Sequence, residues 1–304
     1  MNLKRSTDSV LEAFGFDPAT RLAIFHADDV GMCHGANLAF EELSQLGAIN
    51  CGSVMVPCPW FTEVAQMAAA NQDLDLGVHL TLTSEWATYR WAPISTTSQS
   101  SGLIDEHGYF WHRLPMLAAH LVPEAAEAEM RAQIDQALAS GIDITHLDTH
   151  MGVAVLPQLI EIYIRLGHEY RLPILLPKQI LEYTAVLDFA GINMDGYEEL
   201  LAALEAEGWP LIDHFRMTPG VPSVESDQSY RELVSTVLPG LTMISIHPNK
   251  SGDIETIVPA KAHFRTDEYR IFSDAELQHL VAQQGIQTTG FRPLRHLLRQ
   301  RFGQ

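Results

Sequence analysis

The sequence has 304 residues, enough to bury a large core in one domain or in two ordinary ones. Its formal net charge of −19 argues against binding of nucleic acid or of an anionic membrane through a broad basic surface. Cys33, Cys51 and Cys58 are odd in number and lack a C-x-x-C spacing, so neither a disulfide framework nor a zinc ribbon is indicated. No apolar run has the length of a signal-peptide core or of a membrane span, so we expect a cytoplasmic protein.

Apolar runs that are typical of buried strands alternate with helical patterns along the chain. We predict strands at residues 22–28, 51–56, 74–82, 142–147, 173–176, 211–215, 241–246 and 286–289. We predict helices at residues 36–46, 61–70, 123–140, 156–166, 196–207, 226–237 and 274–284, followed by a terminal basic helix. Strands separated by helices imply a mainly parallel α/β sheet, and seven or so such units favour a TIM-like (β/α) barrel over an open sheet.

One segment, at about residues 84–115, breaks this alternation. It carries six aromatic residues around a Ser/Thr-rich middle: Trp86, Tyr89, Trp91, Tyr109, Phe110 and Trp111. Long loops in compact domains are usually functional or disordered, and this density of rings favours a packed loop. A loop that covers substrate and a surface flap on the barrel rim both stay open. We treat residues 1–304 as a single domain with an aromatic-rich insertion.

The first predicted strand ends in two adjacent carboxylates, Asp28 and Asp29, followed by Val30 and Gly31. Adjacent strand residues point to opposite faces, so both can share a site only where the strand breaks into its loop. This carboxyl end is where α/β barrels place their chemistry. In the alternative, structural interpretation, one Asp caps the next helix and the other is solvated.

Polar residues occupy the same position at three later strand ends. His79 lies in one apolar strand, His247 closes another, and His146, Asp148 and His150 cluster at the end of a third. A lone histidine of this kind is commonly a hydrogen-bonded core residue, but three ionisable groups in one apolar strand are costly unless they are paired or bind a metal. Asp and His together fit a facial metal site for zinc, iron, manganese or magnesium. Three protein ligands leave positions open for water and substrate, as in catalytic sites.

No H-E-x-x-H, G-x-S-x-G, P-loop or G-x-G-x-x-G motif competes with this site. Instead, four short motifs in order resemble those of the YdjC-like carbohydrate deacetylases. His26-Ala27-Asp28-Asp29-Val30-Gly31 resembles N-A-D-D-F-G, Gly77-Val78-His79-Leu80 resembles G-x-H-x, residues 145–150 resemble T-H-x-D-S-H, and Ile246-His247-Pro248 resembles the H-P motif. The resemblance extends from about Leu22 to Arg295.

This resemblance implies a distorted seven-stranded (β/α) barrel and metal-dependent removal of acetyl groups from N-acetylated sugars or oligosaccharides. The cofactor would be one divalent metal ion, Mg²⁺ or Zn²⁺. Carried over position by position, the resemblance implies seven roles: metal ligation by Asp29, His79 and His150, general base Asp28, general acid His247, and orientation of the site by His146 and Asp148.

The chain departs from the family pattern beside these residues. His26 stands for the family's Asn and Val30 for its Phe. Met151-Gly152-Val153 follows His150, where the family commonly has further histidines, and Asn249 and Lys250 follow the H-P motif. These changes spare the implied ligands and touch the pocket wall, so they leave the substrate more open than the reaction.

Trp86, Trp91 and Trp111 are candidates for stacking on sugar rings, because flat apolar faces suit pyranose C–H faces. Two alternatives to a deacetylase stay open. One is another metal-dependent hydrolase on the same barrel, acting on a phosphoester or a cyclic amide; the other is an inactive member that binds carbohydrate. We expect a small N-acetylated sugar as partner, with no nucleic acid and no membrane. A homodimer through exposed apolar residues also stays open.

Overall fold

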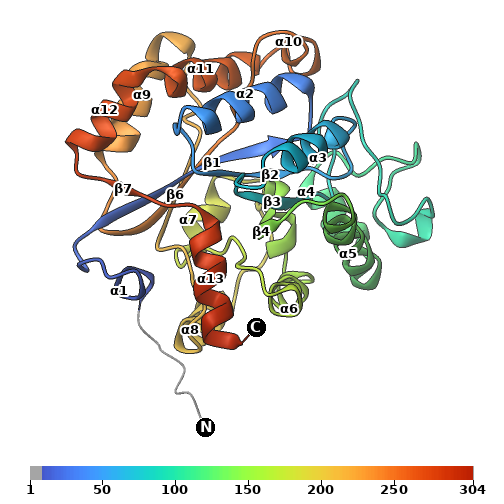
Figure 1. The fold of residues 1–304 in the computed structure, drawn as a ribbon. Helices are drawn as coiled ribbons and strands as arrows, with labels where there is room; N and C mark the ends of the chain where they lie inside the picture. Colours follow the sequence, from blue (N-terminus) through green and yellow to red (C-terminus); the bar gives the residue numbers. More distant parts are fainter. Residues whose placement is uncertain (1–8, 304) are drawn as a thin grey trace.

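A parallel sheet runs through the middle of the molecule (Figure 1). The computed structural model describes residues 9–303; residues 1–8 and 304, which the predicted domain includes, lie outside the described residues. The described strands are β1 (Arg21–Val30), β2 (Cys51–Val54), β3 (Leu76–Leu80), β4 (Ile144–Thr149), β5 (His214–Met217), β6 (Gly240–Ile246) and β7 (Gln287–Thr288). They pair in the order β4-β3-β2-β1-β6-β5, and β7 pairs with β1.

Residues 173–178 close the gap between the edge strands β4 and β5. On one side, the amide of Leu147 donates to the carbonyl of Pro173 at 2.9 Å, and the amide of Leu175 donates to that of Leu147 at 2.8 Å. On the other side, the amide of Lys178 donates to the carbonyl of Ile212 at 2.8 Å. The sheet therefore closes on itself, as the expected (β/α) barrel requires. The continuous strand predicted at 173–176 is wrong: this segment is joined by isolated bridges, which distort the barrel here.

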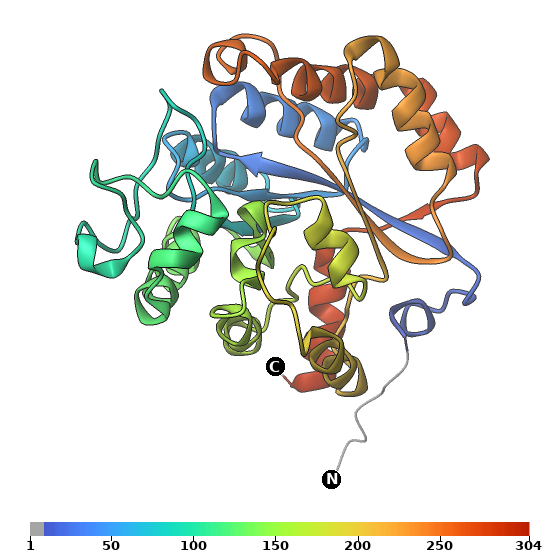
Figure 2. The same cartoon turned by 180° about the vertical axis from the view of Figure 1, so that it is seen from behind.

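Helices cover both sides of the sheet. They are α1 (Val10–Ala13), α2 (His34–Gln45), α3 (Phe61–Ala70), α4 (Leu114–His120), α5 (Pro123–Ala139), α6 (Ile160–Tyr170), α7 (Ile180–Ala185), α8 (Tyr197–Ala206), α9 (Ser223–Ser235), α10 (Ile254–Ile257), α11 (Ala262–Ser273), α12 (Ala275–Gln283) and α13 (Phe291–Phe302). Two 3₁₀ turns are η1 (Gln99–Ser101) and η2 (His150–Val155). In Figures 1 and 2, α2, α9, α11 and α12 lie above the strands, and α6, α8 and α13 lie below. Within residues 9–303, no helix combines the length and apolar character that a membrane crossing needs.

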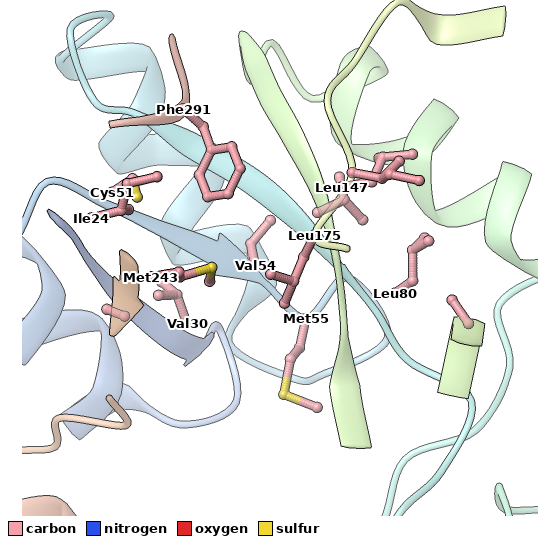
Figure 3. Packing of buried hydrophobic residues seen from close by; sticks show 14 of the residues in the cluster. Ile24, Val30, Cys51, Val54, Met55, Leu80, Leu147, Leu175, Met243 and Phe291 are labelled. Atoms are coloured by element: carbon pink, nitrogen blue, oxygen red, sulfur yellow. The ribbon is translucent and has the colours of Figure 1, made fainter. Parts of the chain in front are cut away.

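The core lies between these layers and the strands. Every residue of β1 from Leu22 to Val30 is buried. Ile24, Val54 and Met243 are among the buried hydrophobic residues of this core (Figure 3). Because both faces of a parallel sheet are covered, its strands read as continuous apolar runs, which is why the sequence reveals them. Any polar side chain in such a strand must find a partner inside the barrel.

Most predicted elements are confirmed, with boundaries that differ by a few residues. The helix predicted at 61–70 coincides with α3, whereas the strand predicted at 22–28 continues as β1 to Val30. The strand predicted at 211–215 begins later, as β5 at His214. No helix is predicted from the sequence at α1, α4, α7, α10 or α11. In α11 only Ala262, Glu268, Ile271 and Phe272 are buried, which is too sparse an apolar pattern to identify a helix.

The aromatic-rich insertion packs against the barrel. Trp91 and Phe110 are buried, and the Phe110 amide donates to the Trp91 carbonyl at 3.2 Å. The carboxylate of Glu129 on α5 accepts the backbone amides of Ile94 at 3.1 Å and of Ser95 at 2.8 Å. These contacts confirm a packed loop. Only its first part, with Glu85 and Trp86, reaches the central cavity described below.

Candidate active site

The carboxyl ends of the strands surround a cavity of about 260 Å³. Six of the seven predicted polar residues line it: Asp28, Asp29, His79, Asp148, His150 and His247. The lining also contains a group of mostly apolar side chains: Leu175, Tyr183, Val186, Leu187, Phe215 and Met217. The parallel barrel thus brings together side chains that lie up to 219 residues apart, as far as Asp28 is from His247.

A β-bulge lets both aspartates face this cavity. Ala27 pairs with Gly52 and Val30 pairs with Val54, so three steps along β1 match two steps along β2. The extra residue disrupts the normal alternation of sides. Asp29 takes the left-handed conformation, with a φ of 59°, which an L side chain adopts only at a cost of about 1–3 kcal/mol. The prediction that the strand breaks into its loop at this pair is wrong, because β1 continues to Val30 and bulges instead.

Asp29, His79 and His150 direct three ligand atoms at one point. Asp29 Oδ1 lies 3.4 Å from His79 Nε2 and 3.2 Å from His150 Nδ1, and the two nitrogens lie 3.3 Å apart. Donors bound at about 2.1 Å on one face of an ion are separated by about 3.0–3.4 Å. Asp29 Oδ1 is buried and has no hydrogen-bond partner. A buried, unsatisfied carboxylate oxygen beside two imidazole nitrogens fits a divalent cation.

Each of these three side chains is held by a second polar residue. Nδ1 of His79 lies 2.7 Å from Oδ2 of Asp148. His150 Nε2 lies 2.9 Å from Oε2 of Glu85, and Arg265 Nη2 donates to Oδ2 of Asp29 at 2.7 Å. Carboxylates behind histidine ligands fix the tautomer and raise the basicity of the nitrogen that faces the metal.

The electrostatics of the triad favour a cation. Burial by itself lowers the pKa of His79, but the carboxylates of Asp148, Asp29 and Asp28 outweigh it and raise this pKa well above its usual value. Burial likewise lowers the pKa of His150, yet Glu85 and Asp29 raise it to about 9. Burial raises the pKa of Asp29, but Arg265 and the two histidines hold it well below its usual range. The negative charge of the carboxylates therefore dominates the electrostatic potential in this part of the cavity.

Asp28 and His247 face each other beside the triad. Oδ2 of Asp28 lies 3.7 Å from Nε2 of His247. The other nitrogen of His247, Nδ1, lies 2.8 Å from Oγ1 of Thr218, whose hydroxyl donates to Glu268 at 2.5 Å. Because Thr218 donates to Glu268, its oxygen accepts from Nδ1–H of His247. This fixes the His247 ring and leaves Nε2 free toward Asp28.

Of the remaining predicted residues, Trp86 lines the cavity, whereas His146, Trp91 and Trp111 lie outside its lining. His146 is fully buried below the cavity, where its Nε2 lies 2.9 Å from Nε2 of His26. Trp86 lines the cavity, and its indole N–H is buried without a hydrogen-bond partner. Trp91 donates to the carbonyl of Thr83 at 2.8 Å and is not among the lining residues. Trp111 also lies outside the lining and stacks on His120, with ring centroids 4.2 Å apart.

Comparison with known proteins identifies the family to which the chain belongs. The family described as YdjC-like protein matches residues 22–283, from β1 to the end of α12. The chain belongs to the YdjC-like family. A carbohydrate deacetylase of Thermus thermophilus is 40% identical over 277 residues, which cover 90% of this chain and 94% of that protein. A carbohydrate deacetylase of Brevibacillus brevis is 27% identical over 276 residues, or 89% of this chain and 98% of that protein.

The fold of this YdjC-like protein also occurs among solved structures. A protein of Enterococcus faecalis V583, described as a proposed cellobiose-phosphate cleavage protein, superposes with a TM-score of 0.73 at 21% identity. The match covers 90% of this chain and 99% of that one.

Polar residues of the site of this YdjC-like protein that were not predicted from the sequence include Glu85, Thr218, Arg265 and Glu268. Glu85 lies three residues beyond the strand predicted at 74–82 and belongs to no recognisable motif there. Arg265 and Glu268 lie on α11, which no apolar pattern had revealed. Thr218 directly follows β5, and this position at a strand end is the one sequence feature that could have identified it as a site residue.

Proposed function

We propose that this YdjC-like protein is a metal-dependent carbohydrate deacetylase that removes acetyl groups from N-acetylated sugars. The observation that carries the proposal is the convergence of Asp29, His79 and His150 on one point, with Asp28 and His247 in the same cavity. The names of the Thermus thermophilus and Brevibacillus brevis relatives support the reaction and the substrate class.

Asp29, His79 and His150 would hold one divalent ion, Mg²⁺ or Zn²⁺. When bound, such an ion polarises a carbonyl oxygen and lowers the pKa of water. Three protein ligands would leave further coordination positions for water and substrate. Asp148, Glu85 and Arg265 would keep these ligands in place through the contacts described above.

Asp28 and His247 would supply the proton transfers. Oδ1 of Asp28 is engaged by His26 at 2.6 Å and by the hydroxyl of Ser245 at 3.1 Å, so Oδ2 is the oxygen that faces the cavity. Asp28 takes a proton from the attacking water as the new C–O bond forms. His247 then donates the proton on Nε2 to the amine nitrogen as the C–N bond breaks, which releases acetate and the free amine. Positioned acid–base groups contribute about 10²–10⁴-fold each.

The cavity wall suits a sugar that carries an apolar substituent. Trp86 offers a ring face and an unpartnered N–H group in one place. Phe215 and Tyr183 form a T-shaped pair in the cavity lining, with ring centroids 4.8 Å apart. Aromatic faces pack on C–H surfaces, while a buried donor without a partner gains most from a hydroxyl or carbonyl oxygen. We propose that these residues bind the N-acetylated sugar.

Acetate release tests the proposal directly. Protein stripped with a chelator is incubated with N,N′-diacetylchitobiose or N-acetylglucosamine, before and after addition of Zn²⁺ or Mg²⁺. We expect acetate only after metal is returned, and release about 10²–10⁴-fold slower from the Asp28→Asn variant under the same conditions. Acetate release that is indifferent to the chelator would contradict metal dependence. Absence of acetate with every metal, together with phosphate release from a sugar phosphate, would overturn the proposed reaction.

A further inference from the structure

His26 lies directly below Asp28 and carries neither a metal-binding nor a proton-transfer role in the proposed function. Its side chain is fully buried in β1. Nδ1 lies 2.6 Å from Oδ1 of Asp28, and Nε2 lies 2.9 Å from Nε2 of His146. Both ring nitrogens are therefore engaged. His26, Asp28 and Asp148 also gather close enough to suggest a second metal site, but Nε2 of His26 is 4.0 Å from Asp148 and has the closer partner in His146.

The chain of hydrogen bonds continues from His146 away from the cavity. Nδ1 of His146 lies 3.0 Å from Oγ1 of Thr145, whose hydroxyl donates to Oδ1 of Asp75. Oδ2 of Asp75 accepts the backbone amide of Arg292 at 2.7 Å, at the start of α13. The buried path therefore connects Asp28 at the cavity with the N-terminus of a helix at the other end of the barrel.

This network determines which nitrogens carry protons. Because Thr145 donates to Asp75, its oxygen accepts from Nδ1–H of His146. Nε2 of His146 is then an acceptor, and Nε2 of His26 must be the donor between the two rings. Burial and the neighbouring His26 lower the pKa of His146 well below its usual value, in agreement with a neutral ring. One further proton lies between Nδ1 of His26 and Oδ1 of Asp28.

Packing fixes both rings in this arrangement. Phe291 stacks on His146 with centroids 3.9 Å apart and meets the edge of His26 at 6.1 Å. Gly77 lies against the other face of His146, where a Cβ atom would come within 2.6 Å of the ring. Neither imidazole can turn over without displacing these neighbours.

We propose that His26 is a positioning residue for Asp28: its Nδ1 holds Oδ1 of Asp28 so that Oδ2 faces His247, and His146 fixes the orientation of the His26 ring. The kinetic consequence rests on the proposed deacetylase function, whereas the hydrogen-bond arrangement does not. Misplacement of a reacting group by about 1 Å can cost about 10²-fold in rate.

Two substitutions test the two ring nitrogens of His26 one at a time. His26→Asn places an amide N–H near the position of Nδ1 and gives up the contact with His146. His26→Gln reaches toward His146 and gives up the Nδ1 contact with Asp28. We expect His26→Gln to lower kcat about 10–100-fold with KM and metal content unchanged, and His26→Asn to stay within about threefold of the wild type. Wild-type kcat in His26→Gln, or equal losses in both variants, would overturn the inference.

A measurement independent of activity completes the test. In wild-type protein labelled with ¹⁵N-histidine, long-range ¹H–¹⁵N spectra assign the protons on each ring. We expect a far-downfield proton coupled to Nδ1 of His26, a protonated Nδ1 on His146, and loss of the downfield proton in Asp28→Asn. A His26 ring whose Nδ1 shows no such proton would overturn the inference even if the enzyme is active. The expected spectrum without acetate release would instead count against the proposed function alone.

Discussion

The carboxylate of Asp148 lies 2.7 Å from Nδ1 of His79 and so directs the opposite nitrogen, Nε2, at Asp29. The hydroxyl of Ser53 donates to the same carboxylate oxygen at 2.8 Å. All three side chains are buried. The orientation of His79 is therefore built into the barrel interior before any ligand arrives.

We predict that Asp148→Asn weakens metal affinity about 10–100-fold. An amide that donates to Nδ1 would turn the protonated nitrogen of His79 toward Asp29, where a lone pair is needed. Isothermal titration with Zn²⁺ measures the change. The matched control is Asp143→Asn, which alters a half-exposed carboxylate just before the same strand and should leave metal affinity unchanged. Equal affinities for the wild type and Asp148→Asn would contradict the prediction.

We predict that Asp28→Asn and His247→Asn each lower kcat about 10²–10⁴-fold while the protein still binds metal. Neither residue belongs to the triad, so elemental analysis should find the same metal content as in the wild type. Asp29→Ala, His79→Ala and His150→Ala should lose both metal and activity. If Asp28→Asn retained near-normal turnover with metal bound, the general base would have to be another group.

We predict that metal affinity rises with pH up to about 9. Histidine must be deprotonated to bind metal, and the pKa of His150 is raised to about 9, while that of His79 is also raised. Below that pH each displaced proton makes apparent affinity change about tenfold per pH unit, so two protons give about 100-fold. Titrations in buffers of different ionisation enthalpy count the protons. Glu85→Gln removes a carboxylate that raises the pKa of His150 and should flatten the slope.

We predict that Trp86→Ala raises KM for the sugar substrate several-fold or more with little change in stability. Aromatic rings that stack on flat ligand groups contribute about 1–3 kcal/mol where nucleic-acid bases are the ligand. Trp86 lines the cavity, whereas Trp111 stacks on His120 away from it. Trp111→Ala should lower the free energy of unfolding and leave KM unchanged. Steady-state kinetics and urea unfolding of the two variants distinguish a substrate contact from a packing contact. Equal KM values would remove Trp86 from the substrate site.

We predict that Gly77→Ala destabilises the fold by about 1–3 kcal/mol through overpacking. The new Cβ would lie 2.6 Å from the ring of His146, which has no free space to move into. Gly220→Ala is the control, because no atom lies within 4 Å of a Cβ at that position. Urea unfolding of the two variants is compared at one pH. A stable Gly77→Ala protein would mean that the His146 ring is less constrained than the packing implies.

The sequence was sufficient to predict the barrel because the strands are buried on both faces. Residues 241–246 are mostly apolar, with Thr242 and Ser245 as the polar exceptions, and the helix after Pro123 has clear boundaries. The segment at 173–178 has the same apolar character, but short length and prolines leave it bridged to its neighbours rather than fully paired. Its departure from a regular strand is visible only in the structure.

The implied ligands could be named in advance because the resemblance to the YdjC-like deacetylases assigned them. Their positions at strand ends further predicted that Asp and His side chains would meet in one site. The residues that support these ligands could not be named in advance. Arg265 approaches Asp29 from α11, 236 residues further along the chain, and Glu268 on the same helix holds His247. Which side chains become hydrogen-bond partners of the site depends on how the helices pack on the sheet. The spacing of residues in the sequence does not indicate this. Trp91 was predicted to stack on a sugar, but its buried ring packs the insertion and its indole N–H donates to the backbone.

The bulge in β1 makes this strand sensitive to length as well as to chemistry. Deleting one residue between Ala27 and Val30 would restore regular pairing with β2 and leave a single carboxylate on the cavity side. An insertion elsewhere in the strand would shift the whole set of buried side chains to the other face. Grafting this aspartate pair onto another barrel would therefore require β1 and its partner strand to be transferred together, because the offset is defined by both.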